Sequence, residues 1–326
     1  MPPKPRAERL TRALALAAAL ATVTVAAYAR YPERPIRMIV SSAPSSGPDV
    51  IARLVATQLT ETLGEQVVVD NRAGAGGNIG AEIVAKSPPD GYTMLVATAN
   101  HAIAATLFPK LTYDLMKDFA PAGMIATTPY LLVVNPALPA RTVLEFIALA
   151  KAKPGSLLYG SGGSGSPPHL VAEIFKSMAK IDMVHVPYKG VTPAITDLVG
   201  GQVQAVFAVV PAAMPLVKAG RLRALGVSTA RPSPLAPDVP PIADGLPGFE
   251  VIGWYGLLLP ARTPGAVIAQ VDEALQRVLQ RADIHERLTS QGAQAAPGTP
   301  QRFRAFLSGE VTKWGGAVRA SGAKAD

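Results

Sequence analysis

The sequence predicts an α/β protein with mainly parallel sheets, built as two lobes that exchange strands. Short β-rich runs alternate with helical stretches along most of the 326 residues, a pattern typical of strand–helix–strand units. Several strand candidates are continuous apolar runs, as expected for strands that are buried on both faces. A chain of this length favours two domains. No simple linker separates two consecutive domains, so we expect the chain to cross between the lobes twice.

The individual elements follow from apolar periodicity and from turn residues. Gly64 is expected to end the first helix, because glycine readily adopts the left-handed conformation found there. Pro264 and Pro300 stand where a first helical turn tolerates proline. Strands are expected at 36–40, 67–70, 93–98, 131–134, 157–159, 183–186, 205–209, 224–228 and 256–259. Helices are expected at 49–63, 81–86, 141–151, 169–179, 192–200, 264–281 and 300–321.

The composition permits large cores and excludes several chemistries. Apolar residues make up 49% of the chain and charged residues 17%, which argues against disorder. The chain has no cysteine. Disulfides, thiol catalysis and thiolate metal sites are therefore excluded.

The N-terminus has the layout of a signal peptide. Four basic residues, the last of them Arg12, precede an apolar run at 13–27, and Ala27-Tyr28-Ala29 reads as a cleavage site. The run is short for a membrane span, although an uncleaved anchor helix is the alternative. We expect residues 1–29 to be removed after Ala29. Because cysteine is absent, we expect the mature protein to carry no lipid and to be free in the periplasm.

The mature chain is only mildly basic. Removing residues 1–29 takes away four positive charges and one negative charge, which lowers the net charge from +8 to about +5. No cluster of lysine and arginine stands out, so nucleic acid is not expected as a partner. A modest positive field would help to gather anions.

Three small, polar segments follow expected strand ends and precede expected helices. They are 41–49 (Ser-Ser-Ala-Pro-Ser-Ser-Gly-Pro-Asp), 98–101 (Thr-Ala-Asn-His) and 160–169 (Gly-Ser-Gly-Gly-Ser-Gly-Ser-Pro-Pro-His). Ligands of open α/β sheets sit at the carboxyl ends of strands, and a helix N-terminus offers free N–H groups and a positive dipole end. We therefore expect these segments to converge on one carboxylate without a cationic side chain.

Each of these residues also has a structural interpretation. Glycine and serine are common in turns for backbone reasons alone, and Asp49 is equally consistent with a helix N-cap. His101 and His169 are either ligand contacts or satisfied structural histidines. His185 is expected to be structural, and His285 is expected on a helix surface.

Enzyme motifs mostly fail. Gly160, Gly162 and Gly165 match the dinucleotide fingerprint, but the ribose-binding acid is misplaced, because Asp182 falls at the start of the next strand. The chain has no G-x-S-x-G elbow, no P-loop lysine motif and no metal-binding histidine spacing. No catalytic residue, metal or cofactor is therefore expected. The glycine-rich segment 71–80 resembles a phosphate loop without its lysine, and we favour a structural or gate role for it.

Eight segments, in one order along the chain, resemble the Bug/TctC family of extracytoplasmic solute receptors of tripartite tricarboxylate transporters. The resemblance covers essentially the whole mature chain. The segments are Tyr-Pro-Glu-Arg-Pro-Ile-Arg (31–37), Asn-Arg-Ala-Gly-Ala-Gly-Gly-Asn-Ile-Gly (71–80), Pro-Asp-Gly-Tyr-Thr (89–93), Lys-Asp-Phe-Ala-Pro (117–121), His-Val-Pro-Tyr-Lys-Gly (185–190), Gly-Gly-Gln-Val (200–203), Leu-Arg-Ala-Leu-Gly-Val (222–227) and Trp-Tyr-Gly-Leu-Leu-Leu-Pro-Ala-Arg-Thr-Pro (254–264).

The resemblance implies a Venus-flytrap fold of the type II periplasmic-binding class. Lobe 1 would hold 30–128 and 227–326, and lobe 2 would hold 129–226. The ligand would be a small carboxylic acid, captured between the lobes by a monomer and passed to the membrane permease subunits of a tripartite tricarboxylate transporter. The expected ligand contacts are Ser42, Pro44, Ser45, Ser46, Gly47, Asp49, Thr98, Ala99, Asn100, His101, Ser161, Gly162, Gly163, Ser164, Ser166, His169, Tyr188, Lys189 and Gly190.

The chain departs from the family pattern at two places. The first loop usually reads Pro-Gly-Gly-Gly-Thr-Asp, whereas here Ser45 and Ser46 replace glycines and Pro48 removes a backbone donor. The family often has Asp-Asn after the strand at 205–207, whereas here an apolar run stands at 208–210 (Ala-Val-Val). An acidic partner for a ligand amine is missing, so we expect a less polar acid without an amino group.

The expected mechanism is closure of the lobes on the ligand, with the closed form recognised by the permease. Trp254 and Tyr255 either line the cleft or pack in the core. Two other classes of function remain open: a ligand sensor that signals to a regulatory partner, and an enzyme that acts on a small acid.

Overall fold

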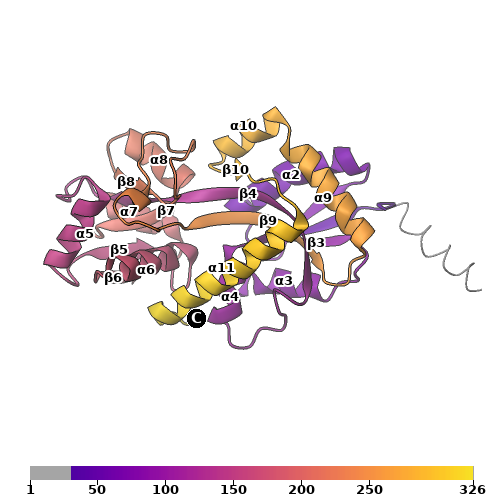
Figure 1. Cartoon of the computed structure of the whole chain (residues 1–326), viewed down its shortest axis with the longest axis horizontal. Coiled ribbons are helices and arrows are strands. Elements are labelled where there is room, and N and C mark those ends of the chain that lie inside the picture. The colour runs from indigo at the N-terminus through magenta and orange to yellow at the C-terminus, as the bar shows by residue number, and fades with distance from the viewer. Residues whose placement is uncertain (1–30, 326) are drawn as a thin grey trace, which may run out of the picture.

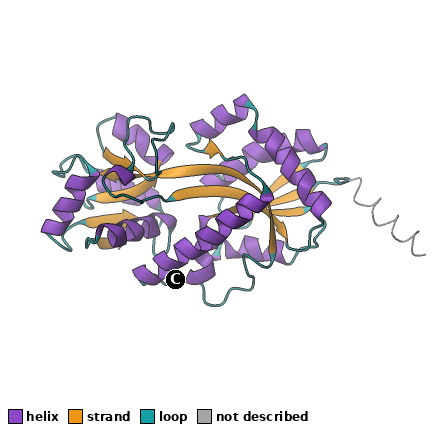
Figure 2. Cartoon of the chain, in the orientation of Figure 1, coloured by secondary structure: helices purple, strands orange, loops and turns teal. Residues whose placement is uncertain are grey.

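The structure, a computed structural model, describes residues 31–325 and shows an elongated α/β molecule (Figure 1). Its strands follow the order β2-β1-β3-β9-β4-β7-β5-β6, and β8 and β10 pair with β4 outside this path. Helices pack on the strands at both ends of the molecule (Figure 2). The mixed α/β fold is confirmed. The expected signal peptide, residues 1–29, lies outside the described residues.

The first half of the sheet is built around three parallel strands and one returning strand. β1 (Ile36–Val40) pairs in parallel with β2 (Val67–Asn71) and β3 (Thr93–Thr98), and β9 (Ile252–Pro260) joins antiparallel to β3. The helices of this half are α2 (Gly47–Leu63), α3 (Asn78–Ala85), α4 (Ala99–Leu107), α9 (Gly265–Leu279), α10 (Ala282–Ser290) and α11 (Pro300–Ser321). Gly64 ends α2 with a φ of 78°, as expected.

The second half repeats the same construction. β5 (Leu158–Ser161) pairs in parallel with β6 (Val184–Pro187) and β7 (Ala205–Val209). Its helices are α5 (Val143–Ala152), α6 (Pro167–Ala179), α7 (Val191–Val199) and α8 (Val210–Lys218). The remaining strands are β8 (Arg223–Val227) and the two-residue β10 (Gln294–Ala295).

One long strand, β4 (Phe119–Val134), joins the two halves. Residues 119–129 pair with β9, and Tyr130–Val134 pair with β7 and β8. The expected strand at 131–134 was therefore too short. Pro121, Gly123 and Pro129 weaken the β signal of its first part, and the register against β9 shifts on both sides of Gly123.

The chain returns to the first half after β8. At this point the buried Ser228 hydroxyl accepts a hydrogen bond from the Tyr130 amide at 2.8 Å and donates one to the Val251 carbonyl at 2.5 Å. Residues 229–250, between Ser228 and Val251, pack on the second half, where the Phe249 ring lies 5.7 Å from that of Phe175. This segment, which joins β8 to β9, therefore carries core residues.

Two helices were not expected, namely α8 and α10. For α4, a helix was expected after 98–101, but its bounds were not. In α8, Pro211 and Pro215 interrupt the helical pattern, which made the segment look like a continuation of apolar strand. None of the helices within 31–325 is long and apolar enough to cross a membrane.

Candidate functional site

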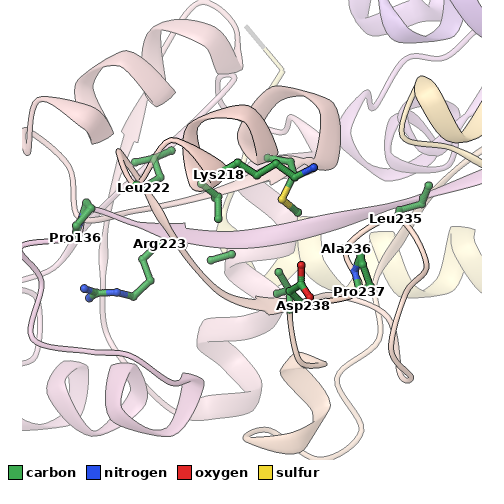
Figure 3. A pocket seen from close by; sticks show the side chains of 13 residues that line it. Pro136, Lys218, Leu222, Arg223, Leu235, Ala236, Pro237 and Asp238 are labelled. Carbon is green, nitrogen blue, oxygen red and sulfur yellow. The ribbon is translucent and has the colours of Figure 1, made fainter.

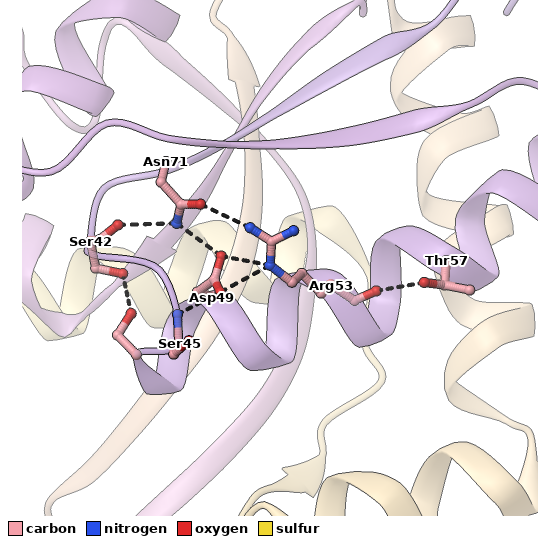
Figure 4. A network of polar contacts seen from close by, with 7 residues as sticks. Ser42, Ser45, Asp49, Arg53, Thr57 and Asn71 are labelled. Carbon is pink, nitrogen blue, oxygen red and sulfur yellow. Dashed lines mark hydrogen bonds and ion pairs between the residues drawn. The ribbon is translucent and has the colours of Figure 1, made fainter.

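The loop after β1 is held by Asp49 at the start of α2 (Figure 4). The buried Asp49 carboxylate accepts hydrogen bonds from the Ser45 amide at 2.8 Å and from Asn71 Nδ2 at 2.8 Å, and it pairs with Arg53 at 3.0 Å. Burial alone would raise the pKa of this carboxyl, but these hydrogen bonds and the charge of Arg53 lower it overall. The N-cap of α2 is Ser46 rather than Asp49, which lies in the first turn. The oxygens of Asp49 are occupied by the loop and its neighbours.

The serines of this loop have different roles. Ser42 and Ser46 bond to each other through their hydroxyls at 2.7 Å. Ser45 adopts a φ of 63°, a left-handed conformation that is costly for any residue with a side chain. The exposed Pro44 and Gly47 lie on the same loop, so this loop presents its outer surface to solvent and its acidic side chain inward.

No loop separates β3 from α4. Thr98 ends the strand and caps the helix, and its hydroxyl accepts from the Asn100 amide at 3.3 Å. His101 completes the cap, since its Nδ1 accepts from the Thr98 amide at 3.0 Å. Ala99 is buried, whereas Asn100 is exposed. The expected loop at 98–101 is therefore the first turn of a helix.

His101 also joins this turn to its neighbours. Its Nε2 lies 3.3 Å from the Ser41 hydroxyl, and a hydrogen bond with the backbone of Gly77 adds to the contact. Burial lowers the pKa of His101 to about 4, so the ring is neutral at pH 7. The imidazole contacts three segments and holds them together, and only 1% of the residue is exposed.

The segment 71–80 packs against the first loop, as the structural interpretation expected. A Cβ atom at Gly80 would stand 2.4 Å from the Ser41 hydroxyl, and one at Gly77 would stand 3.3 Å from Ser41 Cβ. These glycines permit a close backbone approach. Asn71 bonds to the Ser42 carbonyl at 3.1 Å, so both ends of the segment contact the first loop.

The loop after β5 is closed by its own polar groups. The Gly163 amide donates to the Ser161 hydroxyl at 3.1 Å, and the Ser166 hydroxyl donates to the Gly163 carbonyl at 2.7 Å. The Gly165 amide donates to His169 Nδ1 at 3.0 Å. The exposed Ser164 has no such partner among the described residues, so its hydroxyl is free to bind a ligand.

The turn 188–190 lies beside this loop. The Tyr188 amide donates to the Ser161 carbonyl at 3.1 Å, and the Gly190 amide donates to the Gly162 carbonyl at 3.3 Å. The Tyr188 hydroxyl donates to Asp197 at 2.7 Å. Burial and the neighbouring Asp197 carboxylate raise the pKa of Tyr188 to about 12. Lys189 is exposed and is the one cationic side chain of this turn.

A cavity of about 350 Å³ lies between the two halves of the molecule. The expected site residues Asn100, Ser164 and Ser166 line it, together with Ala75 and Gly76 of the glycine-rich segment. The first turns of α4 and α6 both reach it. Pro167 and Pro168 remove two amide donors from α6, so hydroxyl and amide side chains must supply much of the binding. None of the described residues that line the cavity is charged.

One wall of this cavity is apolar, which sequence reasoning missed. Ile103, Leu107 and Phe108 form it. Leu107 also bridges the halves, because a Cβ atom at Gly165 would stand 2.5 Å from its side chain. The sequence carries the signal in the apolar residues that follow 98–101, but the helix expected there was given no bounds and its residues were not assigned to the site.

The structure leaves other expected contacts outside this cavity. The first loop (Ser42–Asp49) and the turn 188–190 do not line it, although they bond to the segments that do. Trp254 packs in the core and donates to Glu310 at 2.8 Å, which settles the alternative left open for it. Tyr255 is half-buried near Gly47.

A larger cavity of about 540 Å³ lies elsewhere, between α8 and the segment 235–239 (Figure 3). Pro136 and Arg223 mark its position, beside the end of β4. Val134 there pairs with Ala205, the first residue of β7, whereas the last residue of β7 pairs with Tyr130. The cavity therefore lies at the amino ends of the parallel strands, opposite the edge at which α/β proteins bind ligands.

Residues 31–325 contain no group of three or more histidine, aspartate or glutamate side chains that could hold a metal ion. The fold and the inter-half cavity together define a two-lobed solute receptor. Residues 51–323 match the family model described as "Tripartite tricarboxylate transporter family receptor". The chain belongs to this family of periplasmic receptors.

Similar proteins agree with this assignment. Protein BugT of Bordetella pertussis is 37% identical over 297 residues, which cover 90% of this chain and 91% of BugT. The solved structure of R. palustris Rpa4515 with adipate has a TM-score of 0.77 at 34% identity, and it covers 90% of this chain and 99% of that one. MatC from Rhodopseudomonas palustris with bound malate has a TM-score of 0.74 at 32% identity, covering 88% and 100%. The family to which the chain belongs is one of receptors, and this chain is a receptor rather than an enzyme.

Proposed function

We propose that this receptor captures a small carboxylic acid in the cavity between its two lobes. The observation that carries the proposal is the convergence of Asn100 and Ser164 on one uncharged cavity, where the first turns of α4 and α6 also meet. Helix N-termini and hydroxyl donors suit an anion. Structurally similar receptors with adipate and malate support the same class of ligand.

The two lobes follow the two halves of the sheet. We assign residues 31–129 and 252–325 to lobe 1 and 130–251 to lobe 2. We place the first crossing between residues 129 and 130, because β4 changes its partners there. We place the second crossing after Val251 rather than near residue 227, because Phe249 packs on Phe175 and Phe207 of lobe 2.

Within the expected site, exposed and buried residues have different tasks. Asn100, Ser164 and Ser166 contact the ligand in the cavity. The first loop and the turn 188–190 come into contact with it when the lobes close further. Asp49, His101 and His169 position the loops rather than contact the ligand, because their polar atoms already bond to the loops.

The ligand is an acid with an apolar body and no amino group. Ile103, Leu107 and Phe108 give the cavity its apolar wall, and Ala208 and Val209 stand at the end of β7, where the family often has an acid and an amide. A ligand ammonium would find no carboxylate among the described cavity residues and would lose hydration without compensation.

The chain is exported by cleavage after Ala29, works as a monomer in the periplasm and delivers its ligand to a tripartite tricarboxylate permease. Membership of the receptor family supports this delivery. The apolar segment at 13–27, with its basic flank, supports export by a cleaved signal peptide.

Calorimetric titration of the mature chain, residues 30–326, tests the proposal. Adipate is the probe for an apolar-bodied acid, malate for a polar acid, and aspartate for an acid with an amino group. We expect adipate to bind more tightly than malate and aspartate not to bind at micromolar concentration. Micromolar binding of aspartate would overturn the specificity, and failure of all carboxylic acids, in protein shown by mass spectrometry to carry no ligand, would overturn the function.

A further inference from the structure

The rings of His169 and His185 stack beside residues 161–166, the loop of lobe 2 that reaches the cavity. The rings of His169 and His185 lie 3.9 Å apart, centre to centre, at an interplanar angle of 14°. His169 comes from the first turn of α6 and His185 from β6, so the pair joins two elements. The Tyr159 ring lies 5.0 Å from that of His185 and 6.3 Å from that of His169, so a residue of β5 also packs on the pair.

Each ring bonds to the loop. The Gly165 amide donates to His169 Nδ1 at 3.0 Å, which requires a neutral His169 with its proton on Nε2. His185 Nε2 lies 2.6 Å from the Ser161 hydroxyl, and this bond forms with either atom as the donor. The two anchors differ, because a proton on Nδ1 of His169 would face the Gly165 amide, whereas a protonated His185 can still donate to Ser161.

The surroundings keep both rings neutral. Burial lowers the pKa of His169, while the Glu173 carboxylate raises it and the Lys176 ammonium lowers it. For His185, burial and the neighbouring His169 lower the pKa to about 4. Glu173 and Lys176 are the charged groups that act on the pair, and they pair with each other at 2.8 Å, so their opposing charges largely cancel.

Gly165 connects this pair to the other lobe. It lines the cavity, adopts a φ of 72° and lies against Leu107 of α4. The neighbouring Ser164 and Ser166 line the same cavity. The orientation of the Gly165 amide therefore fixes the turn that presents both serines, and it also sets how this turn meets lobe 1.

We propose that His169 is a proton-sensitive positioning residue: when neutral it fixes the Gly165 turn, and one proton on it releases the turn and weakens ligand binding. This rests on the proposed function, in that 164–166 contact the ligand. His185 is the second half of the device: it stacks on His169 at 3.9 Å, and a charge on His169 lowers the pKa of His185, so His169 takes the first proton. Acidification would thus promote release of the ligand by the receptor itself.

The first test follows the Gly165 amide and the His169 ring by NMR in the mature chain between pH 7.5 and 4. We expect the amide signal of Gly165 to move with the midpoint of the His169 ring, below 6.5. In His185→Gln the Gly165 signal should still follow the His169 midpoint, because it is His169 that bonds to that amide. His285→Gln is the matched control. His285 of α10 bonds to the Leu279 carbonyl at the end of α9, so this substitution should leave the His169 midpoint unchanged. A Gly165 amide that ignores the ring titration would overturn the proposal.

The second test measures adipate affinity at pH 7.5 and one pH unit below the His169 midpoint. At the lower pH about one tenth of the receptor keeps a neutral His169. Between the two pH values, the dissociation constant of the wild type should therefore rise about tenfold more than that of His169→Gln. Gln offers an acceptor to Gly165 without titrating, and protonation of adipate is the same for both proteins. Equal ratios in the two proteins would overturn the proposal while leaving the receptor function intact. If adipate fails to bind at either pH, the function is at fault and the NMR titration still decides on His169.

Discussion

The Ser228 hydroxyl accepts a hydrogen bond from the Tyr130 amide at 2.8 Å, at the residue where β4 leaves one set of partners for another. The same hydroxyl donates to the Val251 carbonyl at 2.5 Å. One fully buried side chain therefore ties together the two strands of chain that pass between the lobes. The crossing is a bonded pair of segments rather than two independent linkers.

Replacing Ser228 by alanine should destabilise the protein. The substitution leaves a buried amide and a buried carbonyl without partners, which costs about 2 kcal/mol. The melting temperature should fall by roughly 4–8 °C. Ser156→Ala is the control, because the exposed Ser156 hydroxyl bonds only to the Lys153 carbonyl of its own turn. Equal melting temperatures for the two variants would contradict this account of the crossing.

The neighbouring serines 45 and 46 should respond to glycine in opposite directions. Ser45 holds a φ of 63°, so Ser45→Gly relieves strain and should raise stability by about 1 kcal/mol. Ser46 has an ordinary φ of −73° and bonds to Ser42, so Ser46→Gly should lower stability by about 1 kcal/mol. Urea unfolding of both variants measures the difference. A stabilising Ser46→Gly together with a destabilising Ser45→Gly would show that the loop geometry is wrong.

Asn100 and Ser164 should each contribute to affinity from opposite sides of the cavity. Loss of one hydrogen bond to a charged carboxylate costs about 1.5–3 kcal/mol, which corresponds to roughly a ten- to hundredfold weaker dissociation constant. We expect this from Asn100→Ala and from Ser164→Ala in calorimetry with adipate. Ser308→Ala, at an exposed position of α11, serves as the control. Affinities equal to that of the control would remove these residues from the site.

His101 should make the stability of the protein depend on pH. Its pKa is lowered from 6.5 to about 4 by burial, so the folded state is favoured while the ring is neutral. That stability is complete above pH 6.5 and is lost as the pH falls towards 4, by about 3 kcal/mol in total. His101→Gln should flatten this part of the profile in unfolding experiments at pH 7 and pH 4.5. A slope identical to that of the wild type would assign the effect to other groups.

The sequence predicts most of the regular elements but not the partners of β4. The run at 131–134 is a plain apolar strand, whereas 119–130 contains Pro121, Gly123 and Pro129. The register against β9 shifts on both sides of Gly123, and a shift of register is a tertiary property. The same limit applies to β9, which was expected at 256–259 but begins at Ile252.

The candidate site was predictable in its polar residues and not in its walls. Asn100, Ser164 and Ser166 were expected from strand-end chemistry and meet in one cavity. The buried roles of Asp49 and His101 depend on partners from distant segments, such as Asn71 and Ser41, and no spacing in the sequence reveals them. Leu107 contacts Gly165 because the tertiary fold packs α4 of one lobe against α6 of the other.

The position of β9 has a consequence for how the chain folds as it is made and exported. This strand lies between β3 and β4, yet Leu258 pairs with Leu95, a residue that leaves the ribosome long before it. Until β9 emerges, the facing edges of β3 and β4 have no strand to pair with, whereas residues 130–251 can complete their own sheet earlier. Pairing across such a sequence distance is slow. Half of the molecule therefore stays unfinished until β9 has been made.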